Sequence, residues 1–218
     1  LLFRHWDSWE DGKRSHVFTW TIGGGEPVDL MKGMDADAPT HPFGGTEELA
    51  ISPDGKEVLF AAKDDGNANA WTTNIDVWRV PADGSARPVR VSLGQGMDNV
   101  PSYSPDGKTI AWLSMARAGY EADRQCIVLL DRASGAQRNL TQAWDRSPSE
   151  YCWSEDGRTL YATADDLGNH SLFAIDAVTG RVTTLVPKGT VASPAPAGTR
   201  LVYALDTLRS PAQLFSIG

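Results

Sequence analysis

The residues best suited to chemistry in this sequence are two carboxylates, Glu121 and Asp123, which share one segment with Tyr120 and Arg124. A carboxylate in a partly dry cleft can bind an ammonium group and offset its lost hydration, because charge-assisted hydrogen bonds contribute about 1.5–3 kcal/mol. Tyr120 and Arg124 could shape or neutralise such a pocket. The alternative is that the two acids pair with Arg117 or Arg124 on a solvated loop, since surface ion pairs are common and weak.

Three tryptophans, Trp6, Trp9 and Trp71, form a second candidate group. Exposed aromatic side chains on loops can pack against a substrate side chain or another domain, because they bury a large area at a small cost in rotamer entropy. Tryptophans also fill gaps between packed sheets, and this alternative stays open.

Several other kinds of site are not expected from the sequence. No serine has a glycine two places before it, as the Gly-x-Ser-x-Gly nucleophile motif requires. The run Gly23-Gly24-Gly25 lacks the lysine and the helix of a phosphate loop, so it is predicted to form a hairpin turn. The four histidines and two cysteines have no metal-ligand spacing, so we expect no metal and no cofactor. Cys126 and Cys152 are predicted to be ordinary buried thiols, with a disulfide between them as the alternative.

The elements that must position these side chains can be predicted from a turn that recurs along the chain. Its copies are Ser52-Pro53-Asp54-Gly55, Ser104-Pro105-Asp106-Gly107, Ser154-Glu155-Asp156-Gly157 and the degenerate Pro196-Ala197-Gly198. The aspartate caps such a turn through its side chain, and the glycine takes the positive φ that the turn needs. The glycines are spaced 52, 50 and 41 residues apart, which is typical of a four-stranded sheet repeated several times.

Each turn precedes an apolar run, and a variable loop and further short strands follow it. The strands predicted directly after the turns are 57–61, 109–113, 159–162 and 200–203; the third strands are 75–80, 127–131, 171–176 and 213–217. Short fourth strands are predicted at 89–91, 138–140 and 182–185. Because such short turns join antiparallel strands, we predict an all-β fold, a TolB-like or WD-like β-propeller of four-stranded antiparallel blades. A β-sandwich also has many short strands, but it needs no internal repeat.

The repeat predicts a partial propeller of about 4 to 5 blades. We expect a partial blade over 1–32 with strands at 1–4 and 16–22, complete blades over 45–94, 98–142 and 148–188, and a partial blade over 192–218. Closed propellers usually carry four to eight blades and hide their strand edges only by forming a ring. Because this chain starts and stops in mid-blade, it is expected to be a piece of a longer protein. An open arc exposes strand edges and tends to associate, which leaves a homo-oligomer open.

The charge pattern narrows the expected partners. The formal net charge is −8, and lysine and arginine are not clustered, so nucleic acid is not expected to bind. The sequence has no apolar run of about 18 residues, so we expect no membrane span.

Three stretches resemble the propeller of bacterial serine peptidases of the prolyl oligopeptidase family, in particular the acylaminoacyl-peptidase branch and its enzymes of the dipeptidyl-peptidase V type. They are Arg4–Lys13 with His16-Val17-Phe18, Ala70–Asp76, and Ser114–Arg124. The Ser-Pro-Asp-Gly turns are less specific, because TolB-like propellers share them. The resemblance covers essentially the whole chain.

The resemblance implies a parent serine exopeptidase in which the propeller gates short peptide substrates and orients them. A C-terminal α/β-hydrolase domain, absent from this chain, would carry the catalytic triad, so we expect no catalytic residue here and no peptidase activity from this chain alone. Glu121 and Asp123 would then anchor the free amino terminus of a substrate that loses a dipeptide. The family implies the periplasm, with the cytoplasm as the alternative. A non-enzymatic, TolB-like protein-binding propeller and a purely structural scaffold remain open alternatives.

One further pair, Glu47-Glu48, is similar to the paired glutamates of dipeptidyl-peptidase IV. In that branch the pair lies on a short helical segment. Here we expect the two acids to open the innermost strand of a blade, so we predict a role at the start of that strand and not in substrate binding.

Overall fold

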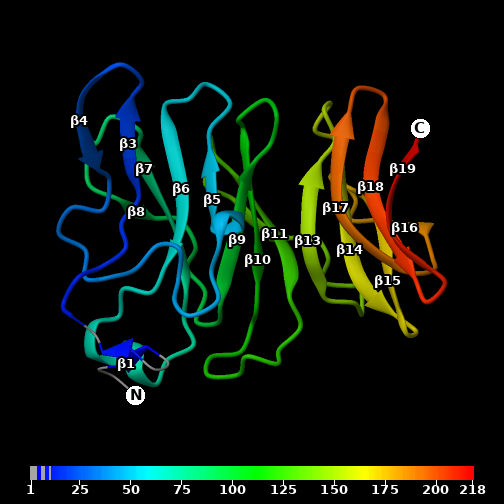
Figure 1. Ribbon diagram of the computed structural model, residues 1–218, viewed down its shortest axis with the longest axis horizontal. Coiled ribbons are helices and arrows are strands. Elements are labelled where there is room, and N and C mark those ends of the chain that lie inside the picture. The colour runs from blue at the N-terminus through cyan, green and yellow to red at the C-terminus, as the bar shows by residue number, and fades with distance from the viewer. Residues whose placement is uncertain (1–3, 6–7, 10) are drawn as a thin grey trace. The chain divides into compact units, whose positions relative to one another are not determined.

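The computed structural model describes residues 4–5, 8–9 and 11–218. The regular secondary structure of the described residues consists almost entirely of short, mostly antiparallel strands joined by turns and loops (Figure 1). It divides into two compact units. Unit 1 takes the described residues up to Tyr103 together with Trp112–Asp123, and unit 2 takes Ser104–Ala111 with Arg124–Gly218. None of the helices in the described part of the chain has the length and apolarity needed to cross a bilayer.

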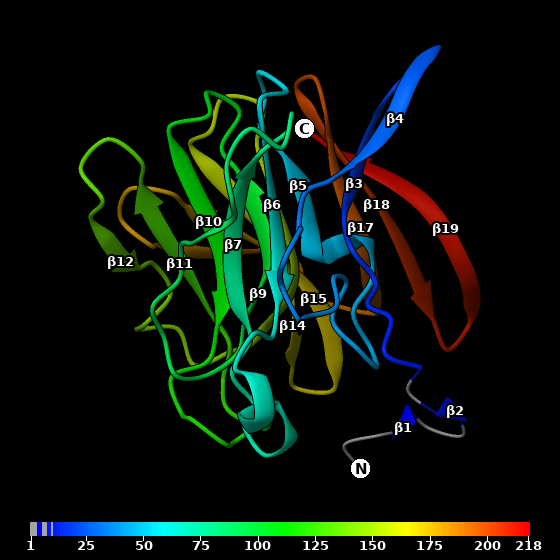
Figure 2. The same ribbon diagram turned by 90° about the vertical axis from the view of Figure 1, so that its left-hand side faces the viewer.

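Two small hairpins come first, and a four-stranded sheet follows. The hairpins pair β1 (Arg4–His5) with β2 (Ser8–Trp9), and β3 (Phe18–Thr21) with β4 (Gly24–Asp29). The sheet has the order β5-β6-β7-β8, with bounds β5 Leu49–Ile51, β6 Glu57–Ala62, β7 Asp76–Pro81 and β8 Val89–Arg90 (Figure 1). Figure 2 shows β5, β6 and β7 side by side. Two 3-10 helices lie in this region, η1 (Thr46–Glu48) before β5 and η2 (Gly66–Ala70) between β6 and β7.

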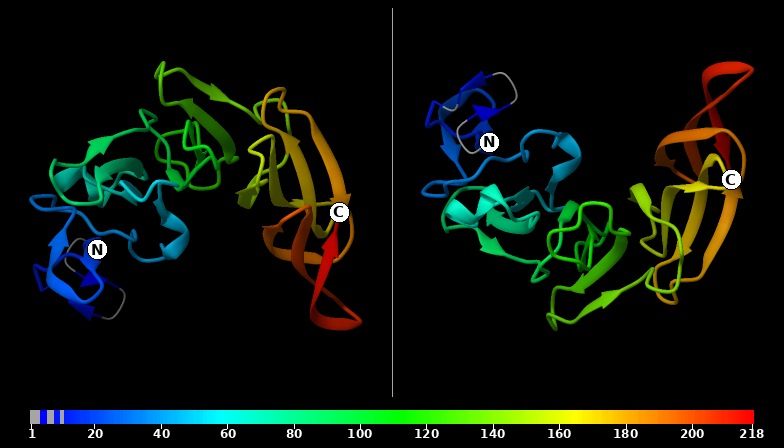
Figure 3. Two further views of the ribbon diagram at one scale, coloured as in Figure 1. Left: turned by 90° about the horizontal axis from the view of Figure 1, so that it is seen from above. Right: turned by 90° about the horizontal axis from the view of Figure 1, so that it is seen from below.

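The remaining strands form two further sheets. One has the order β9-β10-β11-β12, with bounds β9 Asp98–Tyr103, β10 Thr109–Ser114, β11 Cys126–Asp131 and β12 Gln137–Asn139. The other has seven strands, with bounds β13 Pro148–Trp153, β14 Thr159–Asp166, β15 Asn169–Asp176, β16 Val182–Val186, β17 Thr190–Ala197, β18 Arg200–Thr207 and β19 Ser210–Ile217. A single parallel pair, His170 with Thr190, joins β15 to β17, and β17, β18 and β19 continue side by side (Figures 1 and 3).

The strands after each repeated turn confirm the predicted all-β class. β6, β10, β14 and β18 begin at the residues that the turns predict, and β14 and β18 run on several residues further than expected. The predicted strand at 16–22 is shorter, at Phe18–Thr21, and Gly23 lies in its hairpin turn with a φ of 88°. Of the predicted strand at 1–4, residues 1–3 lie outside the described residues.

The first three copies of the turn have the same hydrogen bonds. In the first copy the Ser52 hydroxyl donates to Asp54 Oδ1 at 2.7 Å, the Lys56 N–H donates to the same oxygen at 3.1 Å, and the Glu57 N–H donates to Ser52 Oγ at 2.9 Å. Equivalent bonds occur at Ser104 with Asp106 and at Ser154 with Asp156. The turn therefore satisfies its own polar groups before any tertiary contact forms.

Each unit has its own apolar core, and in unit 1 the segment that follows β4 contributes to it together with the strands. In unit 1 the core contains Leu30, Met31, Ala36, Ala38, Val58, Phe60, Ala62 and Val80. Leu59 and Ala61, which face the other side of β6, are also fully buried, so this strand is covered on both faces. In unit 2 a core cluster contains Leu172, Val191, Leu201 and Tyr203. Cys126 and Cys152 are free thiols, and burial raises the pKa of Cys152 to about 12.

Candidate functional site

The 116–125 loop joins β10 to β11, and Asp123 fixes the conformation of its first part. Asp123 Oδ2 accepts the backbone N–H groups of Ala116 at 3.0 Å and Arg117 at 2.8 Å. The Asp123 N–H in turn donates to the Tyr120 carbonyl at 3.1 Å. The carboxylate of Asp123 is therefore used to close its own loop, in the way that Asp54 closes its turn.

Arg117 and Tyr120 contact each other on the exposed side of the 116–125 loop. The Arg117 guanidinium carbon lies 4.0 Å from the centre of the Tyr120 ring, and the tyrosine is 44% exposed. Such a cation–π contact at an exposed site contributes about 0.5–1 kcal/mol. The contact gives the loop an ordered surface of one cation and one aromatic ring.

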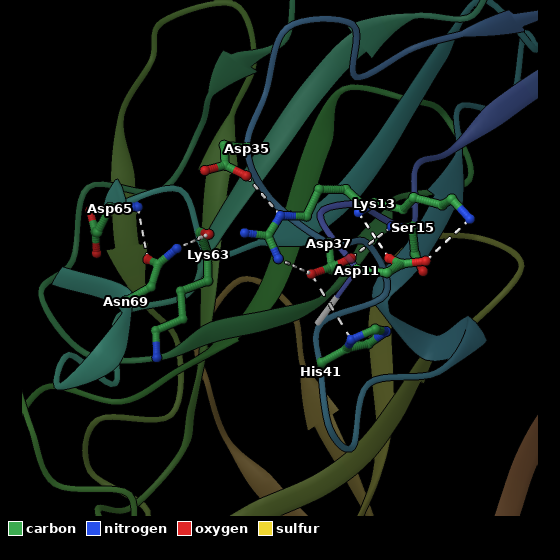
Figure 4. A network of polar contacts seen from close by, with 10 residues as sticks. Asp11, Lys13, Ser15, Asp35, Asp37, His41, Lys63, Asp65 and Asn69 are labelled. Atoms are coloured by element: carbon green, nitrogen blue, oxygen red, sulfur yellow. Dashed lines mark hydrogen bonds and ion pairs between the residues drawn. The ribbon is translucent and has the colours of Figure 1, made fainter. Parts of the chain in front are cut away.

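The 63–74 loop joins β6 to β7 and contacts the 116–125 loop directly. The Gly119 N–H donates to Thr73 Oγ1 at 2.9 Å. Within the 63–74 loop, the Asn69 side chain accepts the Asp65 N–H at 2.9 Å and donates to the Lys63 carbonyl at 3.0 Å (Figure 4). Two loops that are distant in sequence therefore form one surface within unit 1.

Acidic side chains concentrate on this two-loop surface. The Glu121 and Asp65 carboxylates both act on the Lys63 ammonium: burial lowers the pKa of Lys63, and the two acids oppose that shift. The pKa of Asp64 is raised, first by burial and then by the like charges of Asp35 and Asp65. An additional cation beside these acids would offset their repulsion and lower the raised pKa of Asp64.

The four predicted residues of the 116–125 loop differ in whether their side chains already have partners within the protein. Asp123 holds the loop backbone. Within the described residues Glu121 makes no hydrogen bond or ion pair, and its side chain is exposed. Arg124 is used in unit 2, where its guanidinium donates to the carbonyls of Thr141, Gln142 and Trp144. Glu121 is thus the carboxylate of this loop that remains available to a ligand.

Of the three predicted tryptophans, Trp71 is the one whose side chain lies within the described residues. Trp71 follows η2 and is 74% exposed, so it does not fill a gap in the core. Trp9 lies in β2, but its side chain is outside the described residues, and Trp6 is outside them altogether. Trp71 therefore adds an exposed ring to the loop that carries Asp64 and Asp65.

The predicted placement of Glu47-Glu48 in the first strand is wrong, because these residues lie on the 3-10 helix η1, which ends directly before β5. The Glu48 carboxylate is buried and accepts the Thr40 N–H at 2.7 Å and the Thr40 hydroxyl at 2.8 Å. Burial raises the pKa of Glu48, and the neighbouring Glu47 charge adds to the rise. The sequence does not indicate this arrangement, because Thr40 lies eight residues before Glu48. Glu48 is structural, whereas Glu47 is exposed.

Two buried acids that sequence reasoning missed lie at the starts of β7 and β9. Asp76 bonds Arg90 at 3.1 Å, Asn74 at 3.1 Å and the Ser92 hydroxyl at 3.2 Å. Asp98 accepts the indole N–H of Trp112 at 3.1 Å, and burial raises the pKa of both acids. In the sequence, each of these two acids is indicated by its position at the start of a strand. The hydrogen bonds of both acids are made to groups within the fold, so we assign them a structural role.

The described residues contain no group of three or more histidine, cysteine, aspartate or glutamate side chains that could hold a metal ion.

A separate charged network lies at the start of unit 1. There Arg14 bonds Asp35 at 2.7 Å and Asp37 at 3.4 Å, and His41 lies 4.0 Å from Asp37 (Figure 4). Asp35 is thereby shared between this network and the acids of the 63–74 loop.

No protein-family model matches the chain. The chain is similar to a dipeptidyl-peptidase 5 from Trichophyton schoenleinii, with 35% identity over 196 residues that cover 81% of this chain and 27% of that protein. The chain thus spans about a quarter of the length of the curated relatives it matches.

Two solved structures share the fold. TolB from Acinetobacter baumannii matches with a TM-score of 0.63 and 22% identity, over 93% of this chain and 45% of that chain. A puromycin-hydrolyzing peptidase from Mycobacterium tuberculosis matches with a TM-score of 0.67 and 16% identity, over 94% of this chain and 34% of that chain. These likenesses confirm the TolB-like propeller fold, and the sequence relatives support a propeller associated with a peptidase.

Proposed function

We propose that this chain is the substrate-gating part of a serine exopeptidase of the prolyl oligopeptidase family, which releases dipeptides from the free amino termini of short peptides. An α/β-hydrolase domain in the same parent chain would carry out the nucleophilic attack and stabilise the oxyanion. The similarity to proteins named dipeptidyl-peptidase 5 supports this assignment. The periplasm is the compartment that the family resemblance favours.

The observation that carries the proposal is the uncommitted Glu121 carboxylate on the two-loop surface. Glu121, Asp64 and Asp65 supply negative charge, and the pKa of Asp64 is raised in part by its acidic neighbours. The ammonium of Lys63 already lies within the electrostatic influence of Glu121 and Asp65. A substrate ammonium would take the same kind of position, and Tyr120 or Trp71 would pack against the first side chains of the peptide.

The test is Glu121→Gln in the full-length enzyme, assayed on one dipeptidyl substrate with a free amino terminus and on the same substrate with that amine acetylated. Loss of one charge-assisted hydrogen bond of about 1.5–3 kcal/mol corresponds to a fall of about 10- to 150-fold in kcat/KM for the free amine. The acetylated substrate should change less than about threefold. Equal losses on both substrates would contradict an ammonium site at Glu121.

Glu47→Gln is the matched control, because Glu47 is also an exposed glutamate and lies on a 3-10 helix like that of the family pair. If Glu47→Gln gives the selective loss and Glu121→Gln does not, the ammonium site belongs to η1. If neither variant discriminates between the two substrates, neither Glu121 nor Glu47 anchors the amine.

A second candidate function is that of a non-enzymatic binding propeller, which the likeness in fold to TolB favours. The two candidates differ in the reaction with a fluorophosphonate probe. A serine peptidase incorporates the probe at its hydrolase serine and thereby loses all dipeptide release, whereas a binding propeller releases no dipeptide before or after treatment.

A further inference from the structure

Three neighbouring strands of unit 2 bring a serine, a histidine and an aspartate into one hydrogen-bonded row. Ser149 Oγ lies 3.0 Å from His170 Nε2, and His170 Nδ1 lies 2.7 Å from Asp165 Oδ1. Ser149 is on β13, Asp165 on β14 and His170 on β15, and Asp165 and His170 are directly paired in the antiparallel register. The sheet itself therefore holds the three side chains in order.

A β-bulge aims the serine. The register of β13 with β14 passes from Pro148 opposite Ala164 to Glu150 opposite Thr163, so Ser149 is the extra residue of the bulge. Bulges redirect a side chain out of the regular alternation and occur often beside functional sites. Ser149 is exposed, and the His170 side chain is 24% exposed, so a small molecule can reach the pair.

The carboxylate favours the histidine tautomer that activates a serine. An ionised Asp165 only accepts hydrogen bonds, so it favours a proton on His170 Nδ1. Nε2 is then left as an acceptor for the Ser149 hydroxyl. This is the division of roles by which a histidine acts as general base towards a serine. Ser149 Oγ also lies 3.0 Å from Thr163 Oγ1, which gives the hydroxyl a second partner when the base is protonated.

An open cavity of about 700 Å³ adjoins the row, and His170 and Asp165 line it together with Glu150, Asn169 and Thr190–Ala192. Two acids on its wall disfavour anionic molecules. Glu150 is held in place, because its Oε1 accepts the Ser193 N–H at 2.8 Å. The cavity therefore suits neutral or cationic acyl groups.

We propose that Ser149 is an activated nucleophile that accepts the acyl group of small neutral or cationic esters, with His170 as its base and Asp165 as a positioning residue. Ser149 Oγ forms a bond to the acyl carbon while the bond from that carbon to the ester oxygen breaks. The hydroxyl proton moves to His170 Nε2 and then to the leaving alkoxide, so the products are acyl-Ser149 and the free alcohol. Because the Asp165 side chain is 94% exposed, water competes for its charge and the activation is modest.

The test uses p-nitrophenyl acetate as the acyl donor and site-resolved mass spectrometry as the readout. Fragmentation of the tryptic peptide that begins after Arg146 separates Ser149 from Ser147, an exposed serine on the same segment whose Oγ accepts the Gln125 N–H. We expect acetylation of Ser149 to be at least about tenfold faster than that of Ser147, since a positioned base contributes at least that much. The readout identifies the serine, so catalysis by any other domain does not interfere.

His170→Gln should lower Ser149 acetylation to the level of Ser147, while the control His41→Gln, which changes a histidine beside an aspartate in unit 1, should leave it unchanged. Equal labelling of the two serines, or labelling that survives His170→Gln, overturns the proposal. The ¹⁵N shifts of the His170 ring, recorded for the wild type and for Asp165→Asn, test the tautomer directly. A dominant Nδ1–H tautomer, reduced in Asp165→Asn, supports the assignment, and a dominant Nε2–H tautomer overturns it.

Discussion

Carboxylates at the two ends of strand β6 are used in opposite ways. Before the strand, the pKa of Asp54 is lowered, first by the Ser52 hydroxyl and then by the Lys56 N–H. After the strand, the pKa of Asp64 is raised by burial and by the acids Asp35 and Asp65. The residue type is the same, and the two positions are separated by a single strand.

The difference is the supply of local donors. The repeated turn offers each aspartate a hydroxyl and a backbone N–H from residues close in sequence, so its charge is stabilised by the fold and offers little to a ligand. The 63–74 loop gathers acids without enough donors, and the 116–125 loop adds Glu121 to them. Binding of a cation is therefore expected at the loop end of the strands, and loss of stability is expected from substitutions at the turn end.

Removing the hydroxyl that organises a turn should have the largest effect on stability. Ser52→Ala leaves the Glu57 N–H without its acceptor and Asp54 without its shortest hydrogen bond, and Ser52 is buried. We expect the free energy of unfolding to fall by about 1–3 kcal/mol, measured by urea denaturation with tryptophan fluorescence. Ser104→Ala and Ser154→Ala should give similar losses. The exposed Ser85→Ala is the control, and a loss no larger than its own would show that the turn is not held by its serine.

The contributions of Asp54 and Asp98 to the free energy of unfolding should change with pH in opposite directions. Asp54 has hydrogen-bond donors close in sequence, whereas Asp98 is buried by strand pairing. The folded pKa of Asp54 is lowered, so its stabilisation is present above about pH 3.9, the unfolded value, and is lost as the pH falls through the folded pKa. The folded pKa of Asp98 is raised by burial, so its contribution is complete below about pH 3.9 and is lost as the pH rises through the folded pKa.

Urea denaturation between about pH 3 and pH 7 of the wild type, Asp54→Asn and Asp98→Asn measures these slopes. The advantage of the wild type over Asp54→Asn should grow as the pH rises, and its advantage over Asp98→Asn should shrink. Parallel curves for the two variants would mean that the two acids have the same environment.

Sequence reasoning predicted the turns and the strands because their causes are local. The Ser-x-Asp-Gly turn makes its hydrogen bonds within a few residues, and the apolar run after it forms the buried strand. The position of Glu48 could not be predicted in this way, since its carboxylate is fixed by Thr40, eight residues earlier. The same holds for Asp98 and the Trp112 indole, which meet only when strands pair.

The sequence predicts which segment carries the candidate site, but it does not predict which role each side chain of that segment has. The acids of the 116–125 loop predict a binding segment, yet nothing in its sequence distinguishes the structural Asp123 from Glu121, which makes no hydrogen bond within the described residues. That distinction depends on which backbone N–H groups face each carboxylate in the folded loop. The row of Ser149, Asp165 and His170 was missed for a similar reason, because it needs three strands and a bulge.

The smallest expected effect on stability separates the two acids of the 116–125 loop. Asp123→Ala removes the acceptor of the Ala116 and Arg117 N–H groups, so their amide hydrogens should exchange about tenfold faster in hydrogen-exchange mass spectrometry. The free energy of global unfolding should change by no more than about 0.5 kcal/mol, because the loop is at the surface. Glu121→Ala is the matched control and should leave both amides unchanged, since its carboxylate accepts no bond from the described backbone. Unchanged exchange in Asp123→Ala would mean that Asp123 does not hold the loop. Faster exchange in Glu121→Ala would mean that an effect of Glu121 on substrates includes a loss of loop structure.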